Sequence, residues 1–352
     1  MTSDASTTGL LVIGAMLIIP QFTLIHPYLH LLIMAPLLVY TGCQRALVEV
    51  SKGSESQAET VSKKDAMQFP LIGSAVLFGL YIVIKFVKKE YLDMLLAVYF
   101  SALGSFSVYA CIAPPLTSLC GMEQLKRYEW SVHWKVWKRK DAEGADPIQI
   151  SFSWFDLVLY LPCAAASVAY ALTKKWYLNN LLGCAFSVQG IEMLALGSYA
   201  IGCILLSGLF LYDVFWVFGT EVMVSVAKGL NAPIKILFPK ALGVTPIPMS
   251  MLGLGDIVIP GIFVALMLRF DATRQPPTGG SQVYFLSNLV AYTLGLVATV
   301  GVMHFFDAAQ PALLYLVPAC IGSSMLTAAA RGELSALLNF SVEKAAAGTK
   351  AD

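Results

Sequence analysis

Long apolar runs alternate with short polar segments along most of the chain. Each run is close to the roughly 20 residues that a helix needs to cross the hydrocarbon core of a bilayer. After a polar stretch at about 48–68, eight such runs follow, and they are Pro70 to Phe86, Tyr91 to Ile112, Trp154 to Leu172, Leu178 to Leu196, Ala200 to Thr220, Met249 to Phe270, Tyr284 to Phe306 and Pro311 to Ala330. Together with one span in the N-terminal region, the pattern predicts an all-α polytopic membrane protein with nine transmembrane helices.

The N-terminal region is open to three interpretations. Gly9 to Ile25 is an apolar run of 17 residues broken at Pro20-Gln21, and Leu31 to Tyr40 follows almost at once. The run fits one long Pro-interrupted first helix with an interfacial segment, a cleaved leader without the usual basic start, or an additional span. We therefore expect residues 1–27 to stand apart from a membrane domain at 28–335, which a tail at 336–352 follows.

Composition agrees with a membrane protein and argues against other classes. Hydrophobic residues make up 57% of the chain and charged residues 13%, whereas the apolar share of a soluble domain is about half. The net charge of +1, without a basic arm, argues against nucleic-acid binding. The seven cysteines have no CxxC spacing and the four histidines no HExxH spacing, so we expect no disulfide framework, no metal and no cofactor.

The segment between the third and fourth predicted spans is the only sizeable polar excursion. Trp130, Trp134 and Trp137 lie there among basic residues. Next to a membrane, this mixture favours a helix lying on anionic lipid headgroups over a nucleic-acid surface. Membrane lipids are therefore expected partners of this segment.

Charge bias predicts the orientation of the chain. Fifteen Lys and Arg residues fall on one side of the predicted spans and eight on the other. The side richer in positive charge is normally cytoplasmic. This places the N-terminus in the lumen, the C-terminal tail in the cytosol, and the loop between the fifth and sixth of the eight runs in the lumen.

Two acids stand inside successive apolar runs. Asp213 lies in the run Ala200 to Thr220, and Asp256 lies in the next run. If the second helix begins near Pro248 or Met249, each acid is about seven residues, or roughly 10 Å, from the connecting loop. A charge at membrane depth is costly and indicates function, and two carboxyl groups that meet share one proton, which suits them to act as base and acid in peptide hydrolysis.

Three motifs connect these acids to a known family. Tyr212-Asp213, Gly253-Leu254-Gly255-Asp256 and Gln310-Pro311-Ala312-Leu313 are similar to the signature motifs of the intramembrane aspartyl proteases. Within that group, the longer stretches 202–228, 232–239 and 310–322 resemble the signal peptide peptidase family, with presenilin a more distant relative. The resemblance covers roughly residues 67 to 335.

The resemblance implies a nine-span fold of the presenilin and signal peptide peptidase type, located in the endoplasmic reticulum membrane. It implies an aspartic endopeptidase that cleaves signal-peptide remnants and type II transmembrane helices. The resemblance leaves open whether the chain forms a homo-oligomer. Asp213 and Asp256 would be catalytic. The residues expected to shape the site and bind substrate are Tyr212, Gly253, Leu254, Gly255, Gln310, Pro311, Ala312 and Leu313.

Local chemistry gives several of these residues a physical role. Gly253 and Gly255 permit close approach of another backbone and weaken the helix around Asp256. Tyr212 is expected to point away from the catalytic proton and brace a neighbouring helix. A substrate must be unwound before it is cut, and an exposed strand edge can hold it; Ile234 to Phe238 is a candidate for that edge, as is the backbone at Pro311.

Buried acids also allow a structural role for Glu192 and two functions other than proteolysis. Glu192 is a further acid in an apolar run, for which we expect a hydrogen-bonded structural role, with gating or proton supply as alternatives. Buried acids also occur in proton-coupled transporters and channels, although no inverted repeat is evident. A catalytically silent degradation adaptor with the same fold is the third possibility.

Overall fold

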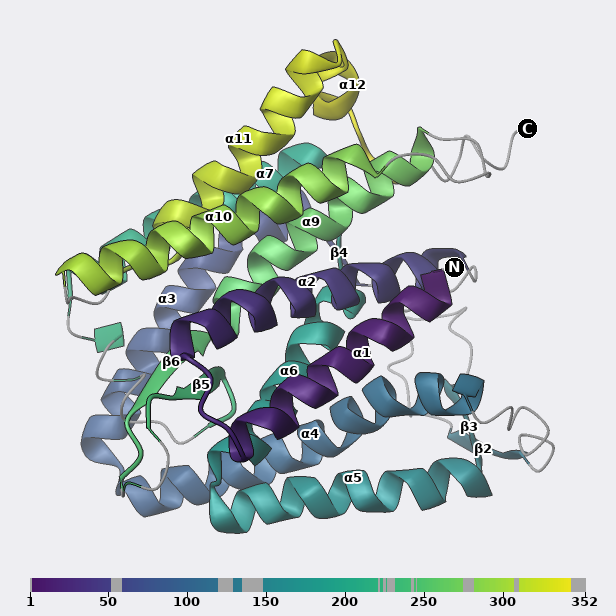
Figure 1. Cartoon of the computed structure of the whole chain (residues 1–352), viewed down its shortest axis with the longest axis vertical. Coiled ribbons are helices and arrows are strands. Elements are labelled where there is room, and N and C mark those ends of the chain that lie inside the picture. The colour runs from purple at the N-terminus through teal and green to yellow at the C-terminus, as the bar shows by residue number, and fades with distance from the viewer. Residues whose placement is uncertain are drawn as a thin grey trace, which may run out of the picture.

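The computed structural model describes residues 2–51, 59–119, 129–134, 148–220, 222, 223, 226, 232–241, 244, 246–274, 282–306 and 310–342. Helices make up most of these residues (Figure 1). They are α1 (Thr2–Ile18), α2 (Pro27–Ser51), α3 (Lys63–Phe86), α4 (Lys89–Leu119), α5 (Trp154–Thr173), α6 (Trp176–Met193), α7 (Tyr199–Phe218), α9 (Gly255–Thr273), α10 (Val283–Phe306), α11 (Leu313–Ala330) and α12 (Leu334–Leu338). The short strands are β1 (Glu59–Val61), β2 (Glu129–Trp134), β3 (Ile148–Ser153), β4 (Leu194–Leu196), β5 (Lys235–Pro239) and β6 (Met249–Gly253).

Seven of the described helices are long and apolar enough to cross a membrane, namely α2, α3, α4, α5, α7, α10 and α11. The polytopic all-α fold is therefore as predicted. Helices α6 and α9 coincide with the two remaining predicted spans, but they carry polar residues such as Asn179, Asn180 and Arg269, all buried. Because both helices pack among other helices, these polar groups meet protein instead of hydrocarbon. The exact count of nine spans stays a prediction.

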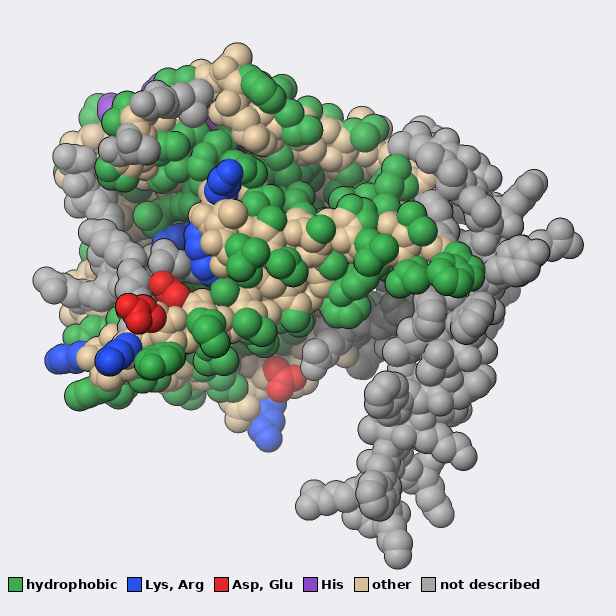
Figure 2. All heavy atoms as spheres, turned by 90° about the horizontal axis from the view of Figure 1, so that it is seen from below, with side chains coloured by type: hydrophobic (Ala, Val, Ile, Leu, Met, Phe, Trp, Pro, Cys, Tyr) green, Lys and Arg blue, Asp and Glu red, His purple; other side chains and the backbone are tan. Residues whose placement is uncertain are grey.

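Helices α3, α4 and α5 form the apolar exterior on one side. Their outward side chains include Leu71, Val98, Leu103, Val158 and Leu161, all of which are exposed. Figure 2, which views this side from below, shows hydrophobic side chains spread over the described surface and charged ones in a few places. This surface is suited to contact with lipid chains.

The N-terminal region forms two helices and not one. Helix α1 ends at Ile18, the short 3₁₀ helix Ile19–Gln21 follows, and α2 begins at Pro27. The two helices run side by side (Figure 1), and Gly9 approaches Thr41 so closely that a Cβ on Gly9 would clash with the threonine hydroxyl. The expectation of one long Pro-interrupted helix is therefore wrong, because the turn after Pro20 reverses the chain.

Two other expectations are corrected by strands. Residues 129–134 form strand β2, paired antiparallel with β3, and not an interfacial helix; Trp137 lies outside the described residues. The second acid-bearing helix starts at Gly255, because Met249–Gly253 is extended and pairs with β5. This pairing satisfies the backbone of a segment in which two glycines disfavour a helix.

Glu192 is held in a largely buried ion pair. Arg45 on α2 donates from Nε to Oε2 of Glu192 at 2.7 Å and from a terminal nitrogen to Oε1 at 3.1 Å. The same guanidinium also donates to the carbonyl of Ala110 on α4 at 3.1 Å. Glu192 thus joins three helices, in agreement with the structural role expected for it.

Candidate active site

Asp213 lies on the inner face of α7, near the C-terminal end of that helix. Ser198 caps the helix by accepting the N–H of Ile201, so the register of α7 is fixed at its start. The side chain of Asp213 is 3% exposed. Its Oδ2 accepts the backbone N–H of Leu313 at 3.0 Å. The contact joins the second half of α7 to the first residue of α11, although 100 positions separate the two residues.

Asp256 lies in the first turn of α9, directly after strand β6. A Cβ added to Gly253 would be 3.2 Å from Oδ2 of Asp256, so the carboxyl group folds back over that glycine. The hydroxyl of Tyr292 on α10 donates to the backbone carbonyl of Asp256 at 3.2 Å. Asp256 is therefore held between a strand, a helix start and a fully buried tyrosine.

The helices that carry the two acids contact each other, although the acids are not at the helical depths predicted from the sequence. Asp256 occupies the first helical turn and not a position two turns into a helix, since the preceding residues are extended. Helix α9 nevertheless packs against α7, which brings the Asp256 carboxyl group within range of the charge of Asp213. Within the part of the chain that the structure describes, neither carboxyl group has an ion-pair partner. Two neighbouring carboxyl groups without a cation can hold a shared proton and a water molecule.

The glycines and Leu254 between β6 and α9 differ in their surroundings. A Cβ on Gly255 would meet nothing within 4 Å, whereas one on Gly253 would press on Asp256. Leu254 donates its backbone N–H to the carbonyl of Ile234 at 3.0 Å, which closes the end of the strand pair. Of the two glycines, Gly253 is thus the one that leaves room for the carboxyl group.

Residues Pro311 and Ala312 precede the helix that the sequence expected to start at Pro311. The carbonyl of Pro311 accepts the N–H of Leu314 at 3.2 Å, and that of Ala312 accepts the N–H of Leu316 at 3.1 Å. Leu313 is the first residue of α11, so its N–H has no partner inside the helix and is free to bind Asp213. Gln310 is half-buried just before this turn.

Tyr212 lies against α3. A Cβ on Gly73 of α3 would be 3.5 Å from the Tyr212 ring. One turn further along α7, Trp216 donates its Nε1–H to Ser74 at 3.0 Å. Tyr212 and Trp216 therefore belong to the seam between α3 and α7.

The candidate strand edge at Ile234 to Phe238 overlaps strand β5 (Lys235–Pro239), but the outer edge of this strand is occupied. Asn180 on α6 accepts the N–H of Leu237 at 2.8 Å and donates to the carbonyl of Leu237 at 2.7 Å. Sequence reasoning missed Asn180 and also Tyr292. Two adjacent amides inside an apolar run were the available signal for the first; a tyrosine in an apolar run gave none for the second.

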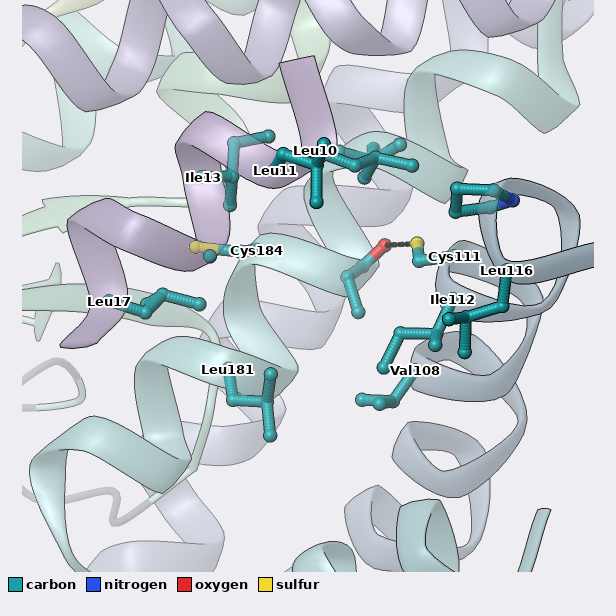
Figure 3. A pocket seen from close by; sticks show the side chains of 14 residues that line it. Leu10, Leu11, Ile13, Leu17, Val108, Cys111, Ile112, Leu116, Leu181 and Cys184 are labelled. Carbon is teal, nitrogen blue, oxygen red and sulfur yellow. Dashed lines mark hydrogen bonds between the residues drawn. The ribbon is translucent and has the colours of Figure 1, made fainter. Parts of the chain in front are cut away.

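A pocket elsewhere in the molecule has a different character. The cavity of about 240 Å³ between α1, α4 and α6 is lined by apolar side chains and two cysteines (Figure 3). Cys111 in it donates its S–H to the carbonyl of Ala185. No acid lines this cavity, so it is not the site of the paired carboxyl groups. Among the described residues, no cluster of three or more His, Cys, Asp and Glu side chains could hold a metal ion.

Comparison with known proteins identifies the class of this protein. The chain is 43% identical to mouse signal peptide peptidase and 42% identical to the human protein, in each case over 318 residues, or 89% of this chain and 82% of the relative. It is 48% identical to intramembrane protease 2 of Caenorhabditis elegans over 216 residues, or 58% of this chain and 46% of the relative. The fold and these similarities define an intramembrane aspartyl protease. The family model described as signal peptide peptidase matches residues 53–344, and the chain belongs to this family.

Proposed function

We propose that Asp213 and Asp256 are the catalytic pair of this intramembrane protease. The proposal is carried by the contact between α7 and α9, the helices that bear these two acids, and by the lack of a neutralising cation at either acid in the described chain. One carboxylate takes a proton from a water molecule as its oxygen attacks the scissile carbonyl carbon. The other carboxyl gives its proton to the carbonyl oxygen. When the C–N bond breaks, the leaving amine takes a proton from the first carboxyl, and the second carboxylate takes back a proton from the hydroxyl that becomes the new carbonyl oxygen.

The hydrogen bond from Leu313 supports a defined orientation of Asp213. A backbone N–H that binds Oδ2 occupies one carboxylate oxygen and leaves the other for water. The motif Pro311-Ala312-Leu313 would then act through its backbone, since Leu313 presents an N–H that a helix start leaves unused. Gln310, Pro311 and Ala312 would shape the wall of the site next to that N–H.

Strand β6 is the edge that we propose for an unwound substrate. It leads directly to Gly253, Leu254, Gly255 and Asp256, so a peptide paired along it would arrive at the acids in an extended form. A transmembrane substrate arrives as a helix with its backbone bonds satisfied internally. New backbone bonds to β6 would offset the loss of those bonds near the cut.

The proposed substrates are signal-peptide remnants and type II transmembrane helices in the endoplasmic reticulum membrane. The names of the mouse and human relatives support signal peptides as a substrate class. Lipids would contact the exposed apolar faces of α3 to α5, and self-association of the chain is compatible with such faces.

The proposed orientation has a lumenal N-terminus and a cytosolic C-terminus. Two of the fifteen positive residues on the cytosolic side, Arg45 and Arg269, are buried in helices; thirteen remain against eight, so the bias keeps its direction. Asn339, in an Asn-Phe-Ser sequon, should then carry no glycan when the protein is made in microsomes. A glycan on the wild type that disappears in Asn339→Gln would show that the orientation is the reverse of the proposed one.

A hydroxyl-bearing isostere of the tetrahedral intermediate tests the catalytic pair. Its hydroxyl would take the place of the attacking water between the acids, so the compound should bind at least about 10²-fold more tightly than a substrate of equal size. Asp213→Ala and Asp256→Ala should each remove this gain, as measured by competition with a labelled analogue. Equal labelling of the wild type and both variants would exclude these acids as the pair.

A further inference from the structure

The outer edge of strand β5 is closed by a side chain that imitates a neighbouring strand. Asn180 is 1% exposed and forms two hydrogen bonds with the same residue, Leu237. Its Oδ1 accepts the Leu237 N–H at 2.8 Å, and its Nδ2 donates to the Leu237 carbonyl at 2.7 Å. One residue of an adjacent antiparallel strand would make this same pair of bonds. Asn180 therefore occupies the place of a third strand.

Two further features close the same edge. Asn179, 4% exposed, donates its Nδ2–H to the carbonyl of Lys235 at 2.7 Å. At the other end of β5, Pro239 has no N–H to offer to another strand. Along the outer edge of β5, the Lys235 carbonyl and both backbone groups of Leu237 are thus taken up, and Pro239 offers no N–H.

Along strand β6, in contrast, outward-facing backbone groups are free to pair with another strand, because bonded and non-bonded residue pairs alternate in an antiparallel sheet. Ile236 is paired with Leu252, and the bond from the Leu254 N–H to the Ile234 carbonyl continues the same bonded series. Residue Met251, opposite Leu237, must therefore turn its backbone N–H and carbonyl away from β5. In the described residues these groups of Met251 have no hydrogen-bond partner, and its side chain is 43% exposed.

We propose that Asn179 and Asn180 are positioning residues that block strand addition at β5, so that an extended substrate pairs with the protease only along β6. The inference rests on the proposed function, because it concerns how the substrate reaches Asp256. Pairing along β6 places the peptide on the strand that continues into Asp256. Pairing along β5 would place it one strand further from that acid, beside helix α6, and would misplace the scissile bond.

Photo-crosslinking of a substrate peptide tests which edge is used. A signal-peptide sequence with a photoreactive residue next to the scissile bond is mixed with the full-length protein in lipid nanodiscs and irradiated. Adducts and cleavage products are mapped by mass spectrometry. The wild type should give adducts at 249–253 and few at 235–239. Asn180→Ala should give new adducts at 235–239 and products cut at additional peptide bonds, with kcat/KM reduced about tenfold.

Asn288→Ala is the matched control for a general loss of stability on removal of a buried amide. Asn288 is also fully buried, and its Nδ2 donates to the Cys320 carbonyl at 2.8 Å and to Ser323 at 3.1 Å, which joins α10 to α11 far along the chain from β5. This variant should lower thermal stability to a similar degree but keep the wild-type adducts and products. If Asn180→Ala does not fold, Asn179→Ala, which removes one bond, should still show adducts near Lys235.

Three results would overturn the inference. These are adducts confined to β6 in every folded Asn179 and Asn180 variant, as many wild-type adducts on β5 as on β6, and spreading of adducts in Asn288→Ala as well. Failure of the proposed function looks different. In that case the wild type does not cut the peptide, or the Asp256→Ala variant still cuts it. The inference then fails together with the proposed function.

Discussion

Two regions of the molecule bury acids in different ways. At the junction of α2, α4 and α6, Glu192 receives two bonds from Arg45, which also binds Ala110. At the junction of α7, α9 and α11, Asp213 and Asp256 lie on helices that contact each other, and only a neutral backbone N–H binds either carboxyl group in the described chain. The first arrangement compensates for burying charge. The second leaves both acids without a compensating cation, as a shared proton requires.

This difference suggests how an acid with a structural role can be distinguished from an acid that takes part in a reaction within the same membrane domain. An acid that serves packing has its lone pairs satisfied by a cation or by backbone N–H groups. An acid that serves chemistry must keep an oxygen open to water and substrate. Asp271 agrees with the first case, since its carboxylate accepts the backbone N–H of Tyr284 at 3.3 Å and of Phe285 at 2.8 Å at the start of α10. Substitutions should therefore affect activity in one region and stability in the other.

The largest effect is expected for the uncompensated pair. Asp213→Asn and Asp256→Asn should each lower kcat by about 10³-fold or more, because the two acids act as a unit. Thermal unfolding should occur at the same or a higher temperature, since an amide of equal size removes a buried charge without leaving a cation alone. Cleavage of a labelled signal peptide and thermal unfolding in detergent measure the two effects. A strongly destabilised protein would show that this pair is structural as well.

Substitution of Glu192 should lower stability and leave kcat unchanged, the reverse of what is expected for the two aspartates. Glu192→Ala leaves the guanidinium of Arg45 buried without its partner, which should cost about 3 to 5 kcal/mol of unfolding free energy. The double variant Arg45→Met with Glu192→Leu should recover most of this stability, since no charge is then stranded. The protein that stays folded should keep its kcat. If kcat falls in the stable double variant, Glu192 takes part in gating or proton supply.

A pair of glycine substitutions tests the geometry around Asp256. Gly253→Ala places a Cβ 3.2 Å from Oδ2 of Asp256, so the carboxyl group must shift by a few tenths of an ångström and kcat should fall roughly tenfold. Gly255→Ala is the matched comparison, since its Cβ meets no atom within 4 Å; it should lower kcat less than Gly253→Ala does. Equal kcat values in the two variants would contradict the observed placement of Asp256.

Tyr292→Phe should give the smallest effect. It removes the hydroxyl that donates to the Asp256 carbonyl at 3.2 Å while keeping the buried ring. One neutral hydrogen bond contributes about 1 kcal/mol, so a loss of kcat of up to about fivefold is expected, with a small loss of stability. Steady-state kinetics with a signal peptide measure it. A loss as large as that of the aspartate variants would give Tyr292 a direct role in the reaction.

The sequence by itself predicted much of this protein. The period of apolar and polar residues predicted most helices to within a few residues, since a helix in a bilayer must be long and apolar whatever its neighbours are. The rarity of acids in such helices was enough to single out Asp213 and Asp256 as functional candidates. The three motifs led to the protease family, which the comparisons confirm.

Only the tertiary structure decided how these segments meet. Met249–Gly253 is apolar and fits a helix by pattern, but pairing with β5 and two glycines makes it a strand, so Asp256 lies at a helix start. Arg45 counted as a loop charge until α2 brought it to Glu192, 147 positions away. Asn180 was one polar residue in an apolar run until α6 placed it on Leu237. Local pattern sets what each segment prefers, whereas hydrogen-bond partners between distant segments are known only once the chain has folded.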